Sequence, residues 1–183
     1  GQNWNLPSPL KLSIGKRIQA GHKTLEDFGT QINLGIATGA NDVFLIEKDK
    51  YDEFIIEDPK NDLILKPILR GRDIQRYSYK HPDSWLILSR NEINVEKEYP
   101  TIFNYLNSFS ESFKNRGAQG KHWTNLRACS FFDDFKKEKI VWIELSDENR
   151  FALCQDEIYF LNTAYFLIPP KELDPKYLLG ILN

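Results

Sequence analysis

Short apolar runs of strand length alternate along this chain with segments of helical periodicity, without the regular spacing of a βαβ fold. The strongest helical signal starts at Pro100 and ends at Gly117, and its large apolar side chains recur at helical spacing: Ile102, Leu106, Phe109 and Phe113. An irregular mixture of this kind favours a mixed α+β fold, since nucleotide-binding sheets repeat strand and helix in turn.

Two further helices are indicated near the ends of the chain. Ser8 and Pro9 have the character of an N-cap followed by proline at the first helical position, which predicts a helix ending near Gly21. Asp174 and Pro175 start a last helix in the same way. Its apolar residues continue to residue 182 without a capping signal, so we expect this chain to be a fragment of a larger protein.

Strands are predicted where apolar residues alternate or form short runs. They cover residues 31–37, 43–46, 74–79, 84–88, 140–145, 151–154 and 158–168. We expect residues 74–79 to pair with 84–88 through a turn, and residues 63–69 to form a short helix because Pro67 is unsuited to a central strand. Together these elements predict one α+β domain over residues 1–183, with a largely antiparallel or mixed sheet and flanking helices.

Three arginines surround a glycine where an apolar run ends, in the sequence LKPILRGRDIQRY at residues 65–77. In one interpretation Gly71 forms a tight turn, and Arg70, Arg72 and Arg76 contact phosphates or base edges, which suit the bidentate guanidinium group. The even spacing of Arg72 and Arg76 would place both on one side of a following strand. In the other interpretation the arginines pair with nearby carboxylates on a solvated loop.

Two loops are further candidates for nucleic-acid contact. Thr38 and Asn41 lie in a glycine-containing turn whose amides and short polar side chains are suited to hold a phosphate, although a purely structural turn fits equally well. Arg116, Lys121 and Trp123 lie in an acid-free segment suited to phosphate contact and stacking. The alternative is that Trp123 folds back to close the core.

Charge is balanced overall but uneven along the chain. The 24 Lys and Arg residues against 26 Asp and Glu residues give a net charge of -2, which argues against a generic polyanion binder. Residues 66–80 nevertheless hold five basic side chains against Asp73 alone, and we include Lys66 among the candidate contacts. Any nucleic-acid surface must therefore be local.

Several other classes are disfavoured by the sequence. The two cysteines have no Cys-x-x-Cys spacing and no histidine has a partner one helical turn away, so we expect no metal site and two reduced thiols. No apolar run reaches the roughly 18 residues of a membrane span. We expect a cytoplasmic protein without a membrane partner, and no catalytic residues in this chain.

An ordered set of motifs carries a family resemblance. GIATGANDVFLI at residues 35–46 precedes LKPILRGRDI at 65–74; Trp85-Leu86-Ile87, Tyr99-Pro100, Arg116, Trp123, Lys139-Ile140-Val141 and residues 178–183 follow. In this order and spacing, from about Trp4 onward, the chain resembles the TaqI-like C-terminal specificity domain of adenine-specific DNA methyltransferases and fused restriction-modification enzymes.

The resemblance implies a DNA-reading domain with duplex DNA and an upstream methyltransferase domain of the same polypeptide as partners. S-adenosylmethionine would serve the parent enzyme, whereas the Asn-Pro-Pro-aromatic motif and the glycine-rich turn that methyl transfer requires are absent from this chain. We therefore expect no cofactor and no methyl transfer here. The alternative function is a non-catalytic assembly domain whose basic patch docks on an acidic partner domain.

Overall fold

Two four-stranded sheets form the centre of the protein in the computed structural model, which describes residues 8–183. Trp4, where the resemblance begins, lies outside the described residues. The first sheet is antiparallel throughout and has the order β1 (Ile32–Leu34), β10 (Ala164–Leu167), β7 (Lys139–Ile143), β8 (Phe151–Cys154). The second has the order β2 (Leu45–Glu47), β6 (Ser84–Ile87), β3 (Leu65–Leu69), β9 (Tyr159–Phe160), with β3 and β9 parallel.

Helices flank these sheets, so the predicted α+β fold is confirmed. They are α1 (Pro9–Gln19), α2 (Asn41–Phe44), α3 (Lys48–Glu57), α4 (Val95–Glu98), α5 (Pro100–Asn107), α6 (Glu111–Lys114) and α7 (Pro175–Leu182). Short 3-10 turns lie at η1 (Glu26–Phe28), η2 (Pro59–Leu63), η3 (Gly71–Asp73) and η4 (Phe132–Lys136). None of the helices within residues 8–183 has both the length and the apolar character needed to cross a bilayer.

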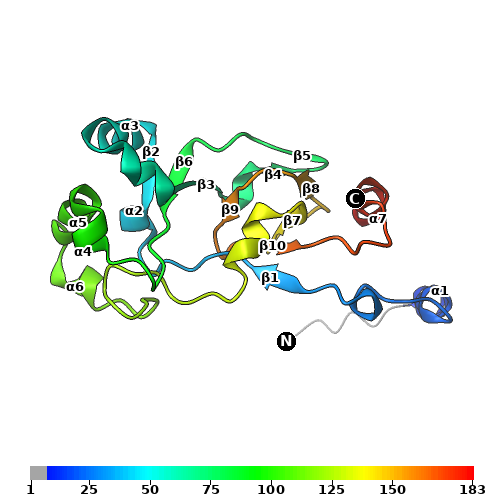
Figure 1. Cartoon of the computed structure of the whole chain (residues 1–183). Coiled ribbons are helices and arrows are strands. Elements are labelled where there is room, and N and C mark those ends of the chain that lie inside the picture. Colours follow the sequence, from blue (N-terminus) through cyan, green and yellow to red (C-terminus); the bar gives the residue numbers. More distant parts are fainter. Residues whose placement is uncertain (1–7) are drawn as a thin grey trace.

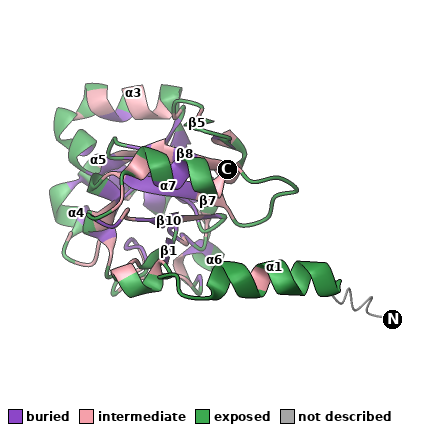
Figure 2. Ribbon diagram, turned by 90° about the vertical axis from the view of Figure 1, so that its right-hand side faces the viewer, coloured by how far each residue is buried: buried purple, intermediate pink, exposed green. Residues whose placement is uncertain are grey.

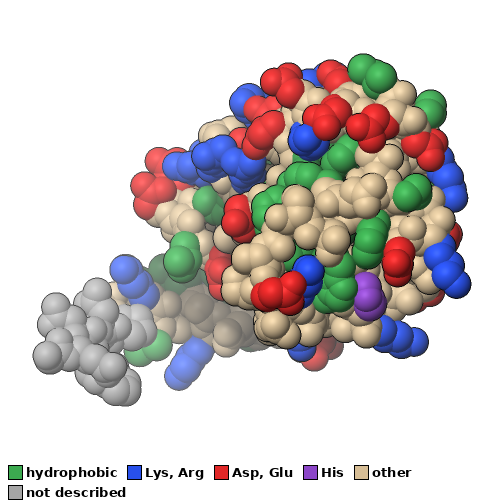
Figure 3. All heavy atoms as spheres, turned by 90° about the vertical axis from the view of Figure 1, so that its left-hand side faces the viewer, with side chains coloured by type: hydrophobic (Ala, Val, Ile, Leu, Met, Phe, Trp, Pro, Cys, Tyr) green, Lys and Arg blue, Asp and Glu red, His purple; other side chains and the backbone are tan. Residues whose placement is uncertain are grey.

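Figure 1 shows the helices divided between the two ends of the molecule. Helices α2 to α6 lie at one end around β2 and β6, and α7 lies at the other end beside β7 and β8. Acidic and basic side chains are interspersed over the helical end, with acidic groups gathered near α3 (Figure 3). This end therefore does not present one continuous basic surface.

One apolar core joins the two sheets, and Phe135 of η4 lies at the junction. Its fully buried ring stacks on Tyr159 of the second sheet at 4.7 Å between centroids and packs against Phe166 of the first sheet at 4.7 Å. A smaller apolar cluster lies between the outer face of the first sheet and Leu178 and Leu179 of α7. Phe135 thus packs against both sheets close to the connection between β9 and β10.

Proline 67 lies within strand β3, so the helix predicted for residues 63–69 is wrong. Strand β3 pairs with β6 over residues 65–67 and with β9 over residues 68–69. Pro67 occupies the changeover between these two ladders, where no residue of β9 is paired with it. The missing N–H group is tolerated there, as it is on an edge strand.

Two other predictions are corrected in the same region. Residues 74–79 form their own hairpin of β4 (Ile74–Gln75) and β5 (Ser78–Tyr79), while β6 pairs with β2 and β3. The long helix predicted from Pro100 is interrupted between Asn107 and Glu111 and continues as α6.

The terminal helices and the later strands confirm the sequence predictions. Ser8 and Asp174 cap α1 and α7 through their side chains. Strands β7 and β8 lie where they were expected. The strand predicted over residues 158–168 is confirmed only in part, because it is divided into β9 and β10, which belong to different sheets.

Helix α1 extends from the body and buries none of its residues (Figure 2). Leu10, Ile14 and Ile18 follow helical spacing but are largely exposed. Because an isolated helix of this length is marginal in water, α1 adds little to the stability of the described chain.

We therefore expect Leu10→Ala in α1 to change the free energy of unfolding by less than about 0.5 kcal/mol. The matched change Leu178→Ala in α7 should cost roughly 2–4 kcal/mol, because Leu178 is 4% exposed whereas Leu10 is 69% exposed. Urea unfolding of both variants measures the difference. Equal losses would show that α1 packs against the body in solution.

Candidate nucleic-acid interface

The arginine turn connects the end of β3 to η3. Asp73 closes the turn, because its carboxylate accepts from the Arg70 N–H at 3.1 Å while its own N–H donates to the Arg70 carbonyl at 2.9 Å. A Cβ atom at Gly71 would lie 3.2 Å from the Ile143 side chain of β7. Glycine thus lets the turn lie directly against the first sheet.

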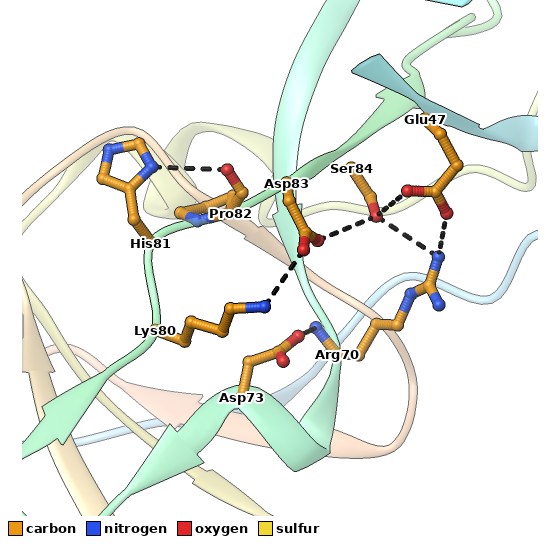
Figure 4. Close-up of polar contacts among 8 residues, drawn as sticks. All are labelled: Glu47, Arg70, Asp73, Lys80, His81, Pro82, Asp83 and Ser84. Carbon is orange, nitrogen blue, oxygen red and sulfur yellow. Dashed lines mark hydrogen bonds and ion pairs between the residues drawn. The ribbon is translucent and has the colours of Figure 1, made fainter. Parts of the chain in front are cut away.

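Arg70 is half-buried and held from two strands of the second sheet (Figure 4). Its guanidinium donates to Glu47 at 2.7 Å and to the Ser84 hydroxyl at 3.2 Å, and Ser84 also donates to Glu47 at 3.2 Å. Within the described part of the chain, the buried Nε group of Arg70 has no hydrogen-bond partner. The contacts therefore fix the orientation of Arg70 without using all of its donors.

Arg72 and Arg76 have different surroundings. Arg72 is exposed on η3, and no carboxylate of residues 8–183 lies within ion-pair distance of it. Arg76 is exposed in the turn between β4 and β5, where it donates to the Asn183 carbonyl and lies 5.3 Å from the ring of Tyr77. The prediction of one strand carrying both arginines outward is wrong, because Arg72 belongs to a 3-10 turn.

Two surface hollows meet at Arg70. The first, of about 500 Å³, is lined by Arg70, Gly71, Arg72, Ile143, Glu144, Leu145, Leu161 and Thr163. The second, of about 430 Å³, is lined by Asn41, Asp42, Leu45, Glu47, Arg70 and Leu161. Because Arg70 and Leu161 line both, we treat the two hollows as one feature, the arginine groove.

The loop that carries Thr38 and Asn41 reaches this groove through Asn41. Thr38 is buried, and its hydroxyl donates to the Asn41 side-chain oxygen at 2.6 Å and accepts from the Ala40 N–H at 3.1 Å. Gly39 has φ +71°, a conformation that glycine adopts without strain. Thr38 thus holds the turn, and Asn41 is the exposed member that lines the groove.

Arg116 lies inside the protein and is only 7% exposed. Its guanidinium donates to three backbone carbonyls, those of Thr38 at 2.9 Å, Trp123 at 2.5 Å and Asn125 at 2.7 Å. Burial lowers the pKa of Arg116 to about 10, so the group stays charged at neutral pH. Arg116 joins the Thr38 loop to the Trp123 loop.

The remaining candidates lie outside the arginine groove. Lys66 lines a separate hollow with Arg90 and Lys136, and Lys121 lines another beside Asn91. Trp123 is half-buried and packs between Phe103 and Phe113 at 5.8 and 5.9 Å between centroids, as the folded-back alternative expected.

Several groove residues were missed by sequence reasoning. Glu47 and Ser84 orient Arg70, while Ile143, Leu145 and Leu161 supply an apolar lining. They come from separate strands and loops of both sheets, so the pairing of β2 with β6, the pairing of β3 with β9 and the place of β7 beside the arginine turn are all needed to bring them together.

The groove offers fixed donors, a side-chain amide, carboxylate acceptors and apolar surface, which are the elements of base and phosphate recognition. Among residues 8–183, no cluster of three or more His, Cys, Asp or Glu side chains is placed to hold a metal ion.

Comparison with known proteins agrees with the resemblance drawn from the motifs. The family model described as TaqI-like C-terminal specificity domain matches residues 66–183. The type II methyltransferase M.MjaIV of Methanocaldococcus jannaschii is 26% identical over 172 residues, which are 88% of this chain and 56% of that protein. The chain thus spans about half the length of this curated relative.

A solved structure shares the fold. It is the type IIL restriction-modification enzyme MmeI in complex with DNA, similar with a TM-score of 0.51 and 14% identity over 83% of this chain and 20% of that one. Since the family model covers more than half of the described residues, the chain belongs to the family of TaqI-like C-terminal specificity domains.

Proposed function

We propose that this chain reads the sequence of duplex DNA as the specificity domain of an adenine-N6 DNA methyltransferase or a fused restriction-modification enzyme. The observation that carries the proposal is the arginine groove. Three residues selected from sequence as DNA contacts line this one groove: Asn41 comes from the loop after β1, and Arg70 and Arg72 come from the arginine turn.

The chemistry of these side chains suits base edges. Arg72 has its guanidinium fork free of carboxylates in the described chain and matches the two acceptors of guanine. Asn41 carries the amide that pairs with adenine in the major groove. Arg70, oriented by Glu47 and Ser84, adds a positioned positive charge between them.

We assign the other candidate residues to two supporting roles. Thr38, Arg116 and Trp123 hold the loop that presents Asn41, through the hydrogen bonds of Thr38 and Arg116. Lys66, Arg76 and Lys121 lie outside the groove and are proposed to contact phosphates, which position a protein on DNA without reading sequence.

Methyl transfer is assigned to another domain of the same polypeptide, which would bind S-adenosylmethionine. The relative M.MjaIV is a type II methyltransferase of which this chain spans about half. In this arrangement the chain fixes the register of the DNA, while the methyltransferase domain takes the target adenine out of the stack.

Arg72→Ala in the full polypeptide should weaken binding to its selected duplex by roughly 1–3 kcal/mol and relax specificity at one base pair. The site is first selected from a randomised duplex library, and affinities are then measured on selected and single-base-altered duplexes at several salt concentrations. Arg17→Ala, which changes an exposed arginine of α1 outside the groove, is the matched control.

A uniform loss of affinity, with a salt slope smaller by about one, would limit Arg72 to a phosphate contact. If Arg70→Ala and Arg72→Ala both left affinity and salt slope unchanged, the assembly-domain alternative would be favoured.

A further inference from the structure

The arginine groove has an apolar floor that the contacts assigned so far do not use. Ile143, Leu145 and Leu161 line the same hollow as Arg70 and Arg72. Leu145 is 88% exposed, whereas Leu161 is only 5% exposed. A single exposed leucine is ordinary on a protein surface. Its place beside two arginines and two other aliphatic side chains is the informative feature.

Backbone contacts hold this floor at a fixed distance from the arginines. The turn at Gly71 lies against Ile143 and Thr163, where a Cβ atom would be 3.2 Å and 3.4 Å from its neighbours. The Glu144 N–H donates to the Thr163 carbonyl at 2.9 Å, which positions Leu145 next to the turn. These contacts therefore hold the backbone of the arginine turn against the segment that carries Ile143 and Leu145.

Carboxylates at the rim favour a base edge over a phosphate at this point. Glu144 lines the hollow, and Asp147 and Glu148 follow on the same loop. Arg150 offsets them in part, since its guanidinium lies 3.4 Å from Asp147 and 4.0 Å from Glu148. A phosphate placed beside Leu145 would meet the partly offset negative charge of this loop, whereas an uncharged base edge would avoid that repulsion.

Only one base combines the properties that this hollow matches. In the major groove thymine presents a methyl group beside a carbonyl acceptor, and guanine presents two acceptors. Arginine only donates hydrogen bonds, so it suits the thymine carbonyl as well as the two guanine acceptors. An aliphatic floor, by contrast, suits only the thymine methyl group.

We propose that Ile143, Leu145 and Leu161 select a thymine through its 5-methyl group, next to a guanine read by an arginine of the same groove. The inference rests on the proposed function and deepens it, because it names a base that the domain requires. Leu145 is then a specificity-determining residue that contacts DNA directly.

The test compares thymine with deoxyuridine, which differs only by the absent methyl group. The duplex selected by the full wild-type polypeptide is resynthesised with deoxyuridine at each thymine position in turn. We expect wild-type affinity to fall about fourfold at one position, as loss of one buried methyl group predicts. Leu145→Ala should weaken binding to the thymine duplex and bind both duplexes equally at that position. Leu10→Ala, which changes another exposed leucine on α1, should keep the wild-type discrimination.

The outcomes separate this inference from the proposed function. If the polypeptide binds its duplex selectively but with the same affinity when deoxyuridine replaces each thymine, the inference is overturned. The proposed function as a DNA-reading domain is then unaffected. Discrimination that persists in Leu145→Ala, with its fold verified by circular dichroism, would also overturn it. If the wild-type polypeptide enriched no duplex sequence at all, the proposed function would fail, and the inference with it.

Discussion

Replacing Arg116 by methionine is expected to lower the free energy of unfolding by roughly 3 kcal/mol, although Arg116 makes no ion pair in the described chain. The substitution removes a donor from each of three carbonyls, two of them in buried hydrogen bonds. The Thr38 carbonyl is left unsatisfied, while that of Asn125 keeps the bond from the Gly120 N–H at 2.9 Å. It also removes a cation that lies 4.6 Å from the ring of Phe44 and 4.9 Å from that of Phe113. Relief of the desolvation that lowers the Arg116 pKa offsets part of the loss.

Urea unfolding of Arg116→Met against the wild type measures this effect, and Arg127→Met is the matched control because Arg127 is exposed nearby in sequence. The loop at residues 38–41 should also exchange its amide hydrogens faster in Arg116→Met, since its anchor to Trp123 and Asn125 is gone. A loss in the free energy of unfolding below about 0.5 kcal/mol would mean that water replaces the guanidinium at these carbonyls. The structural role given to Arg116 would then be contradicted.

Arg116 also illustrates which parts of the candidate site could be predicted from the amino-acid sequence. Basic residues in an acid-free segment indicate candidate contacts, but Arg116 and Lys121 carry the same charge, and only Arg116 is buried. Burial of Arg116 depends on carbonyls supplied by residues 38, 123 and 125, and no local pattern encodes that convergence. Asn41, Arg70 and Arg72 were selected as candidates because turn chemistry and charge are local signals.

The fold was predicted best where local signals agree with tertiary context. The caps at Ser8 and Asp174 fixed the starts of two helices, and alternating residues located β7 and β8. Pro67 led to a wrong helix prediction because the cost of its missing N–H group depends on which strand pairs with β3 at that residue. Strand β3 changes its partner strand at Pro67. Pairing of β6 with β2 and β3 is likewise set by long-range contacts that the chain order does not specify.

Lys139 gives the second large effect expected, because it is fully buried at the start of β7. Its ammonium donates to the carbonyls of Phe135 at 2.7 Å, Lys137 at 3.1 Å and Asp156 at 2.8 Å. These bonds join η4 to the segment between β8 and β9, next to the aromatic junction of the two sheets. The neighbouring lysines in sequence are exposed, so nothing local distinguishes Lys139 from them.

We expect Lys139→Met to lower the free energy of unfolding by roughly 2–4 kcal/mol at neutral pH, because the side chain is similar in length but cannot donate to the three carbonyls. Lys136→Met is the matched control, since Lys136 makes an exposed ion pair with Asp133 of a kind that contributes little. Urea unfolding of both variants measures the difference. Similar small losses would show that the carbonyls are solvated without Lys139.

The pH dependence of this loss tests the state of the buried ammonium. Burial lowers the pKa of Lys139, so the folded state releases its proton at a lower pH than the unfolded state, whose lysine has a pKa of about 10.4. Stability rises with pH wherever the unfolded state binds more protons, so the penalty for burying the charge is full at neutral pH and fades as pH rises through the lowered pKa. The stability gap between wild type and Lys139→Met should therefore widen from pH ~7 to pH ~10. Measured in a Cys154→Ala background, which removes the neighbouring buried thiol, a constant or narrowing gap would mean that the three carbonyls hold the pKa of Lys139 at or above its ordinary value.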